Sequence, residues 1–287
     1  MNDAARVARL LLESASALAE SCNARAIVAY VDALPDMDGL PPRMVLVARD
    51  DEDQRRINNL AKTNPTITVP NVTLDRSAQV KLAAIVALSN RTIDLGDTVI
   101  FLAGPFQALL DSVVVIAIGS EYEMFDSTEQ PAIDEHIQRA VFHRVLSIAM
   151  DLGQHGREGR RVGALLVVGA SKQVLEHSEQ MILNPFKGYD EKQRNILDES
   201  MTETVREYST LDGAFIIRGN GVIETAGARL KVGLSEGLPS GLGARHAAAA
   251  GITANTGSIA FTVSESDGTV RVWRAGRLVA SFGPTTP

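Results

Sequence analysis

The chain has 287 residues, of which 45% are hydrophobic, so it is long enough to bury two cores of ordinary domain size. Its formal net charge of -7 argues against binding to nucleic acid, which depends on basic residues that neutralise phosphates. The single cysteine, Cys22, excludes an internal disulfide, and no apolar run reaches the roughly 20 residues of a membrane span, so we expect a soluble, cytoplasmic protein.

Over the first 125 residues, hydrophobic periodicity predicts helices alternating with strands. The helices are expected at 4–22, from the acids at 50–53 to Leu60, and at 75–88. The strands are expected at 26–30, 44–48, 66–69, 97–103 and 112–118. Because such alternation requires crossover connections and the strands are almost continuously apolar, we expect a small α/β domain with a mainly parallel sheet buried on both faces.

Little in this first domain, residues 1–125, suggests catalysis. Gly104-Pro105 follows a predicted strand, and open α/β sheets bind ligands at such strand ends, but no catalytic set accompanies it. Asp36, Asp38 and Gly39 belong to a Pro-rich surface turn more plausibly than to a metal loop, because the other calcium-loop ligands are missing. We therefore expect a regulatory or assembly-forming domain.

A polar stretch at 125–131 suits a domain boundary, which leaves 126–287 as a second domain. Here helices are predicted at 133–152, 178–184 and 191–208, and a strand at 164–168. His136 and His143 are taken as surface or packing residues of the first helix. The basic residues of the loop 156–163 suggest a solvated turn, with contact to a nucleotide or a partner subunit as the alternative.

Two short clusters point to a phosphate site. Asp212-Gly213-Ala214 opens a strand at 215–217, and 241–246 (Gly-Leu-Gly-Ala-Arg-His) leads into an alanine-rich helix. Glycines let the backbone approach a ligand, and the unpaired N–H groups of a first helical turn attract anions. Each cluster alone is more often a turn or a solvated helix start. Their combination makes a phosphate site the leading hypothesis.

The ordered set of Leu-Asp-Gly-Ala at 211–214, Gly-Asn-Gly at 219–221, the 241–246 cluster and Val-Ser-Glu-Ser-Asp-Gly at 263–268 resembles the diadenylate cyclase family. The resemblance spans about residues 128–283 and includes blocks at 156–160 and 182–186. It implies an α/β cyclase domain with a mixed central sheet flanked by helices. The first domain, through 96–104 in particular, is similar to the pyruvate kinase C-terminal domain, an arrangement that resembles the archaeal type of cyclase.

The family resemblance implies condensation of two ATP molecules into cyclic di-AMP, with Mn²⁺ or Mg²⁺ on the triphosphate. Asp212 would act on the attacking hydroxyl and hold the metal, Arg245 would bind the phosphates, and His246 would contact a phosphate or the metal. The remaining implied nucleotide-binding residues are Gly213, Ala214, Gly227, Ala228, Leu230, Gly243, Ala244, Ser264, Glu265 and Ser266. Some relatives have His before the Asp and a second Glu in the later turn, where this chain has Leu211 and Ser266. The metal would then be held by Asp212 and phosphate oxygens alone.

One cyclase domain supplies one ATP site, so the resemblance also implies a homo-oligomer with two cyclase domains face to face. An alternative is a catalytically silent sensor that binds ATP or a cyclic dinucleotide, although such a protein had no reason to keep Asp212. In a second alternative the first domain is the main ligand sensor and the cyclase its output.

Overall fold

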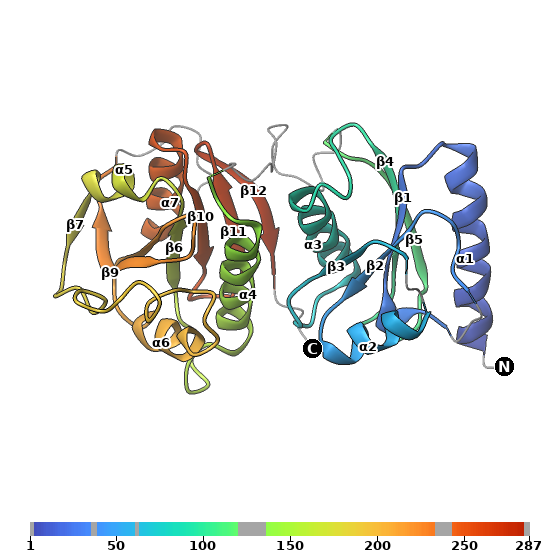
Figure 1. Cartoon of the computed structure of the whole chain (residues 1–287), viewed down its shortest axis with the longest axis horizontal. Helices are drawn as coiled ribbons and strands as arrows, with labels where there is room; N and C mark the ends of the chain where they lie inside the picture. The colour runs from blue at the N-terminus through green and yellow to red at the C-terminus, as the bar shows by residue number, and fades with distance from the viewer. Residues whose placement is uncertain (1–2, 36–38, 61–62, 120–135, 233–242, 284–287) are drawn as a thin grey trace. The chain divides into compact units, whose positions relative to one another are not determined.

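The structure, a computed structural model, describes residues 3–35, 39–60, 63–119, 136–232 and 243–283. The chain divides into two compact units, Met1–Pro131 and Ala132–Thr286 (Figure 1). The polar boundary predicted at 125–131 lies outside the described residues. Within the described residues, no helix is long and apolar enough to cross a membrane.

The N-terminal unit is built on a five-stranded sheet with the order β3-β2-β1-β4-β5. Its strands are β1 (Ala26–Tyr30), β2 (Met44–Ala48), β3 (Thr66–Thr68), β4 (Thr98–Ala103) and β5 (Ser112–Ala117). The first four are parallel, whereas β5 runs antiparallel to β4. This confirms the mainly parallel sheet.

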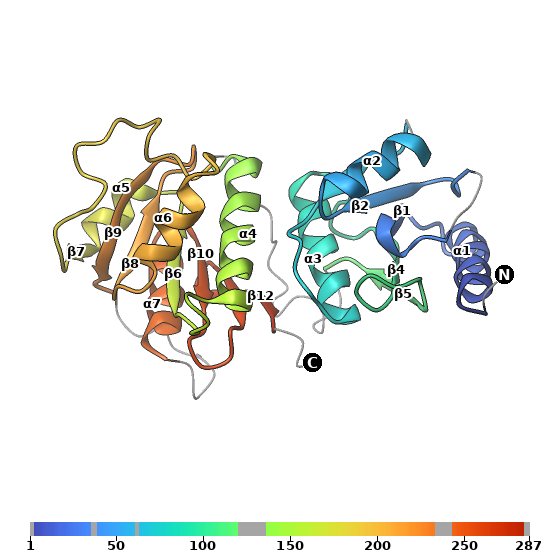
Figure 2. The ribbon, with the colours of Figure 1, turned by 90° about the horizontal axis from the view of Figure 1, so that it is seen from below.

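Helices α1 (Asp3–Ser21) and α3 (Arg76–Ser89) lie on opposite faces of this sheet, and α2 (Asp51–Leu60) connects β2 to β3 (Figures 1 and 2). Asp75 caps α3, because its carboxylate accepts a hydrogen bond from the Ala78 N–H. Burial of every strand on both faces was a wrong expectation for β5, where Val114 and Val115 are exposed, since β5 is an edge strand. Cys22, just after α1, is also exposed.

A buried polar cluster lies at the carboxyl ends of β1 and β2. The Arg49 guanidinium stacks on Tyr30 and Phe106, donates to Gln79 and forms an ion pair with Asp32 at 3.3 Å. Gln79 in turn donates to the carbonyl of Gly104. A Cβ on Gly104 would lie 2.5 Å from the Leu109 carbonyl oxygen, so close packing accounts for this glycine without a ligand.

The C-terminal unit contains a seven-stranded mixed sheet with the order β12-β11-β10-β6-β8-β9-β7. Its strands are β6 (Ala164–Val168), β7 (Ser178–Gln180), β8 (Ala214–Ile217), β9 (Ile223–Leu230), β10 (Ile259–Val263), β11 (Val270–Arg274) and β12 (Arg277–Phe282). Strands β6 and β8 are parallel, and the other neighbouring pairs are antiparallel. The expected mixed central sheet is confirmed.

Helices α4 (Arg139–His155) and α7 (Ala244–Asn255) cover the two faces of this sheet, as alternation along β10 shows (Figure 1). Ala260 packs in the cluster that includes Ala249 and Ala250 of α7. Its neighbour Phe261 faces the other way, with its ring 5.4 Å from that of Phe142 in α4. Small residues on both sides let α7 approach the sheet closely.

Several predicted elements of this unit are wrong. Residues 178–180 form edge strand β7, paired with β9, instead of a helix, and a short helix α5 (Ser171–Glu176) precedes it. The helix predicted from 191 begins only at Met201 as α6 (Met201–Tyr208). In the preceding turns, Asn195 and Asp198 side chains accept hydrogen bonds from nearby backbone N–H groups, which competes with helix formation. Helix α4 begins after Gln138, so His136 is not on it.

Candidate active site

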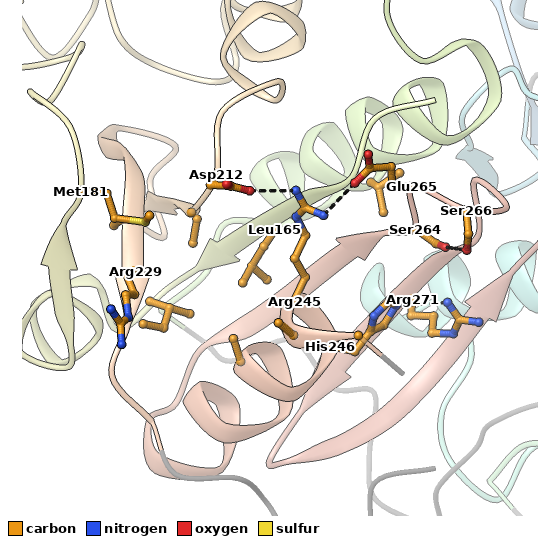
Figure 3. A pocket seen from close by; sticks show the side chains of 18 of the residues that line it. Leu165, Met181, Asp212, Arg229, Arg245, His246, Ser264, Glu265, Ser266 and Arg271 are labelled. Carbon is orange, nitrogen blue, oxygen red and sulfur yellow. Dashed lines mark hydrogen bonds and ion pairs between the residues drawn. The ribbon is translucent and has the colours of Figure 1, made fainter. Parts of the chain in front are cut away.

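The candidate site lies in the C-terminal unit, at one end of the central strands of its sheet. Because β8 is parallel to β6 and both β9 and β10 are antiparallel to their neighbours, the amino ends of β6 and β8 meet the carboxyl ends of β9 and β10 there. The first turn of α7 completes this end of the sheet. Together these segments enclose a cavity of about 600 Å³, within the usual range for small-molecule sites (Figure 3).

Twelve of the thirteen predicted site residues line this cavity. They are Asp212, Gly213, Ala214, Ala228, Leu230, Gly243, Ala244, Arg245, His246, Ser264, Glu265 and Ser266. Gly227 is outside the lining. The structure therefore brings together segments separated by more than fifty positions in the sequence, although their catalytic and binding roles stay predictions.

Arg245 forms the centre of the site. Its guanidinium forms ion pairs with Asp212 at 3.4 Å and with Glu265 at 3.2 Å (Figure 3). The Asp212 side chain is 84% exposed and that of Glu265 is 65% exposed, so both carboxylates remain accessible from the cavity. Ion pairs this exposed contribute little to folding stability and exchange partners readily.

Gly163, which the sequence gave no reason to single out, makes room for Arg245. A Cβ on Gly163 would lie 2.5 Å from a terminal nitrogen of the guanidinium. The only signal in the sequence is its position just before the strand predicted at 164–168. Its contact with Arg245 arises only in the folded chain, where the start of β6 lies beside the first turn of α7.

Gly243 is the N-cap of α7, in extended conformation, and a Cβ there would have no neighbour within 4 Å. The His246 N–H donates to the Gly243 carbonyl, whereas the N–H groups of Ala244 and Arg245 have no preceding helical carbonyl to bind, and the positive end of the helix dipole lies beside them. This end of α7 is therefore suited to an anion in the cavity. Gly241 and Leu242 of the predicted cluster lie outside the described residues.

Gly213 has a packing role in addition to its place in the cavity wall. It adopts a φ of +104°, and a Cβ there would lie 2.6 Å from the backbone of Gly227. Gly227 itself has a φ of +68°, and a Cβ there would lie 2.7 Å from the Ile182 side chain. The close approach of β8 and β9 thus requires Gly213, and the positive φ together with the Ile182 contact favours glycine at 227, whereas the prediction considered only room for a nucleotide.

His246 is buried against the sheet, with its ring 6.0 Å from that of Trp273. Its Nε2 lies 3.1 Å from a terminal nitrogen of Arg271, and because arginine can only donate, Nε2 is the acceptor. Burial first, and then the charge of Arg271, lower the pKa of His246 to about 4. His246 is therefore neutral near pH 7, and its Nε2 is already occupied.

The acidic turn after β10 forms another wall of the cavity. The hydroxyls of Ser264 and Ser266 are 3.0 Å apart, and Arg161 donates to the Ser266 carbonyl at 2.6 Å. Burial raises the pKa of Asp267, but hydrogen bonds from Ser264 and Thr269 outweigh it and bring the pKa to about 2. One arginine of the 156–163 loop thus holds a wall of the cavity, which the solvated-turn interpretation missed.

Seven further lining residues were not assigned to the site from the sequence: Leu165, Met181, Arg229, Ala248, Val263, Asp267 and Arg271. Asp267 falls within the 263–268 motif, which gave a usable signal. Arg229 adjoins Leu230, so it could also have been suspected. Arg271 alternates with apolar residues in an edge-proximal strand, where a charged side chain is ordinarily a solvent-facing one.

Within the described residues, no group of three or more His, Cys, Asp and Glu side chains could by itself hold a metal ion. Mg²⁺ and Mn²⁺ sites on nucleotides do not need such a group, because one or two carboxylates and the phosphates supply the ligands. The exposed carboxylate of Asp212 fits this type of site.

Two parts of the chain match known protein families. Residues 151–278 match a family described as DisA bacterial checkpoint controller nucleotide-binding, and residues 8–125 match one described as Probable sensor domain DacZ_P. Neither description mentions pyruvate kinase, so that likeness of the N-terminal unit stays a prediction.

Two curated relatives carry the name diadenylate cyclase. One, from Methanocaldococcus jannaschii, is 38% identical over 61% of this chain and 56% of its own length. The other, from Haloferax volcanii, is 33% identical over 69% of this chain and 72% of its own length. The match thus spans little more than half of the first relative.

A crystal structure of a double mutant of DacA from Staphylococcus aureus is 24% identical, with coverage of 48% of this chain and 83% of that chain and a TM-score of 0.32. The extent and identity of the Haloferax match show that the chain belongs to the diadenylate cyclase family.

Proposed function

We propose that this chain condenses two ATP molecules into cyclic di-AMP and releases two pyrophosphates. The observation that carries the proposal is the cavity in which the exposed carboxylate of Asp212, the guanidinium of Arg245 and the N-terminus of α7 face one space. This set offers an acceptor for a hydroxyl proton and donors for phosphate oxygens. Such donors, fixed before the substrate arrives, are the main source of transition-state stabilisation in phosphoryl chemistry.

The phosphates bind at the Arg245 side of the cavity in this proposal. Phosphate oxygens displace Asp212 and Glu265 from the guanidinium, because Arg245 can grip two oxygens of one phosphate with its paired N–H groups. Backbone N–H groups at Gly243 and Ala244 bind further oxygens. The exchange releases the Asp212 carboxylate for chemistry.

Asp212 then acts at the 3′-hydroxyl of the ribose. Its carboxylate accepts the hydroxyl hydrogen bond and takes up the proton as the oxygen attacks the α-phosphate of the second ATP. Asp212 together with phosphate oxygens would hold a divalent cation, Mn²⁺ or Mg²⁺. Such a cation, when bound, neutralises charge on the triphosphate and on the leaving pyrophosphate.

The adenine occupies the apolar part of the cavity, bordered by Ala228, Leu230 and Met181. A single cavity then holds one ATP, whose 3′-hydroxyl must reach the α-phosphate of another. Two cyclase domains facing each other across a two-fold axis satisfy this need, so we propose that the active species is at least a dimer.

The N-terminal unit serves regulation or assembly in this proposal, with residues 1–125 as its extent and 126–287 as the cyclase domain. Support comes from the match of residues 8–125 to a probable sensor domain. The cytoplasm, where ATP is abundant, is the proposed location.

Incubation of the purified chain with ATP and Mn²⁺, followed by mass spectrometry of the products, tests the proposal. We expect cyclic di-AMP and pyrophosphate in a ratio of one to two, with specific activity that rises with protein concentration until pairing saturates. ATP binding without any cyclic product would favour the silent sensor instead. Full activity in a proven monomer would contradict the two-domain mechanism.

A further inference from the structure

Three arginines line the cavity, and they differ in their partners. Arg245 already forms ion pairs with two carboxylates. In the part of the chain that the structure describes, no carboxylate forms an ion pair with Arg271, whose terminal nitrogen instead donates to His246. Asp267 interacts with Arg271 only through its charge at longer range. Arg271 therefore has a positive charge that no adjacent carboxylate neutralises.

The position of Arg271 is fixed from two sides. On β11 it pairs with Thr262 of β10, and Trp273, two residues along on the same face, donates to the Thr262 hydroxyl at 2.9 Å. The His246 ring lies edge to face against Trp273 and accepts from Arg271 at 3.1 Å. The guanidinium is thus held by a packed ring instead of by an acidic side chain.

Figure 3 shows where this charge lies in the cavity. Arg245 is in the middle, Met181 and Arg229 are on one side of it, and the His246–Arg271 pair and the two serines are on the other. The apolar wall that suits adenine and the Arg271 wall therefore lie at different ends. A nucleotide that places its base against Met181 directs its phosphates toward Arg271.

We propose that Arg271 is a phosphate-binding residue of the cavity and that His246 is the positioning residue that holds it. The inference rests on the proposed function, since it takes a nucleoside triphosphate as the ligand. One of the five guanidinium N–H groups is used by His246, and no other acceptor among the described residues engages the rest, so they can bind phosphate oxygens. The role predicted for His246, direct contact with a phosphate or metal, passes to Arg271, because His246 is neutral and its Nε2 is engaged.

The first test compares Arg271→Gln with Arg274→Gln, a change on the same strand but outside the cavity lining. Affinity of the full-length chain for ATP and for adenosine is measured by calorimetry in the presence of Mg²⁺. We expect Arg271→Gln to weaken ATP binding about 10- to 100-fold, the effect of losing charge-assisted hydrogen bonds, and to leave adenosine binding unchanged. Arg274→Gln should change neither affinity. Unaltered ATP affinity in Arg271→Gln, or an equal loss for adenosine, would overturn the proposal.

The second test concerns the positioning role of His246. His246→Gln keeps a hydrogen-bond acceptor, whereas His246→Leu has none, so we expect Gln to retain ATP affinity better than Leu. The double variant Arg271→Gln/His246→Leu should bind ATP no more weakly than Arg271→Gln alone, because His246 acts only by holding Arg271 in place. Additive losses would overturn the positioning role. The same cycle built with His246→Gln covers the case in which the leucine variant does not fold.

These binding experiments are separable from the proposed function. If the wild-type chain binds ATP in an Arg271-dependent way but forms no cyclic di-AMP, the cyclase proposal fails and the phosphate-binding role stands. If the wild-type chain forms cyclic di-AMP and Arg271→Gln binds ATP normally, the role of Arg271 alone fails.

Discussion

Each unit of the chain has an arginine that forms an ion pair with Asp at one end of the strands of its sheet, and the two arginines differ in exposure. In the N-terminal unit, Arg49 has a side chain only 5% exposed, and its partner Asp32 is 20% exposed. In the C-terminal unit, Arg245 is 31% exposed and Asp212 is 84% exposed. Aromatic rings cover Arg49, whereas a cavity opens beside Arg245.

The difference shows why only one of these clusters is a candidate for catalysis. Removing a partner from a buried ion pair leaves a charge without solvent, so the pair is locked into the fold. An exposed pair costs little to separate, and a ligand with stronger charge can take over one partner. Arg49 therefore stabilises its domain, and Arg245 is available to a substrate.

The largest effect is expected from Asp212→Asn. The amide keeps the shape of the side chain but loses the charge that accepts the hydroxyl proton, so condensation should fall at least about 100-fold. ATP affinity should stay close to that of the wild type. Cyclic di-AMP formation followed by mass spectrometry and ATP binding by calorimetry measure the two quantities. Normal turnover in this variant would remove Asp212 from the mechanism.

Arg49→Met tests the structural side of the comparison. It leaves Asp32 without the guanidinium, while the backbone N–H at 49 still donates to Asp53, and we expect the free energy of unfolding to fall by about 3 kcal/mol. The matched change Arg245→Met should cost less than about 1 kcal/mol. Far-UV circular dichroism during urea unfolding reports both units, while fluorescence of Trp273, the only tryptophan, reports the C-terminal one. Equal destabilisation by the two changes would contradict the contrast drawn between the clusters.

Arg245→Ala tests the functional side. The variant loses the bidentate grip on phosphate, so we expect ATP affinity to fall by about 1.5 to 3 kcal/mol. Because Asp212 and Glu265 are exposed, their loss of a partner should not unfold the domain. Calorimetric titration with ATP gives the affinity, and an unchanged value would place the phosphates elsewhere in the cavity.

The smallest effect is expected from Gly163→Ala. The added Cβ pushes against the far end of the flexible Arg245 side chain and not against backbone, so the free energy of unfolding should change by less than about 1 kcal/mol. ATP affinity should fall by a few-fold, since the guanidinium is displaced. The matched change Gly159→Ala, at a glycine of the same loop with no neighbour near its Cβ position but a positive φ, should affect stability and not ATP affinity. If Gly163→Ala left ATP affinity unchanged while Gly159→Ala lowered it, the position of Arg245 would not depend on Gly163.

The elements with a strong local pattern were predictable. The strands at 26–30, 44–48 and 164–168 match their predicted bounds, because continuous apolar runs between polar turns have few alternatives. The helix start at 243–246 was predictable from its glycine and alanine content. Segments 178–184 and 191–200 were not, since edge pairing with β9 decides the first and side-chain hydrogen bonds to the backbone decide the second.

The sequence by itself determined the two α/β units, the motif residues and the family resemblance, because these depend on residue types and spacing along the chain. Only the tertiary structure decided that Arg245 lies between Asp212 and Glu265, that Gly163 makes room for it, and that His246 is neutral and bound to Arg271. These relations join residues 20 to over 80 positions apart, and burial and close contact set the charge of His246 and the partners of Arg271. The spacing of residues along the chain does not encode the charge of His246 or the partners of Arg271, so neither could be predicted without the register of the strands.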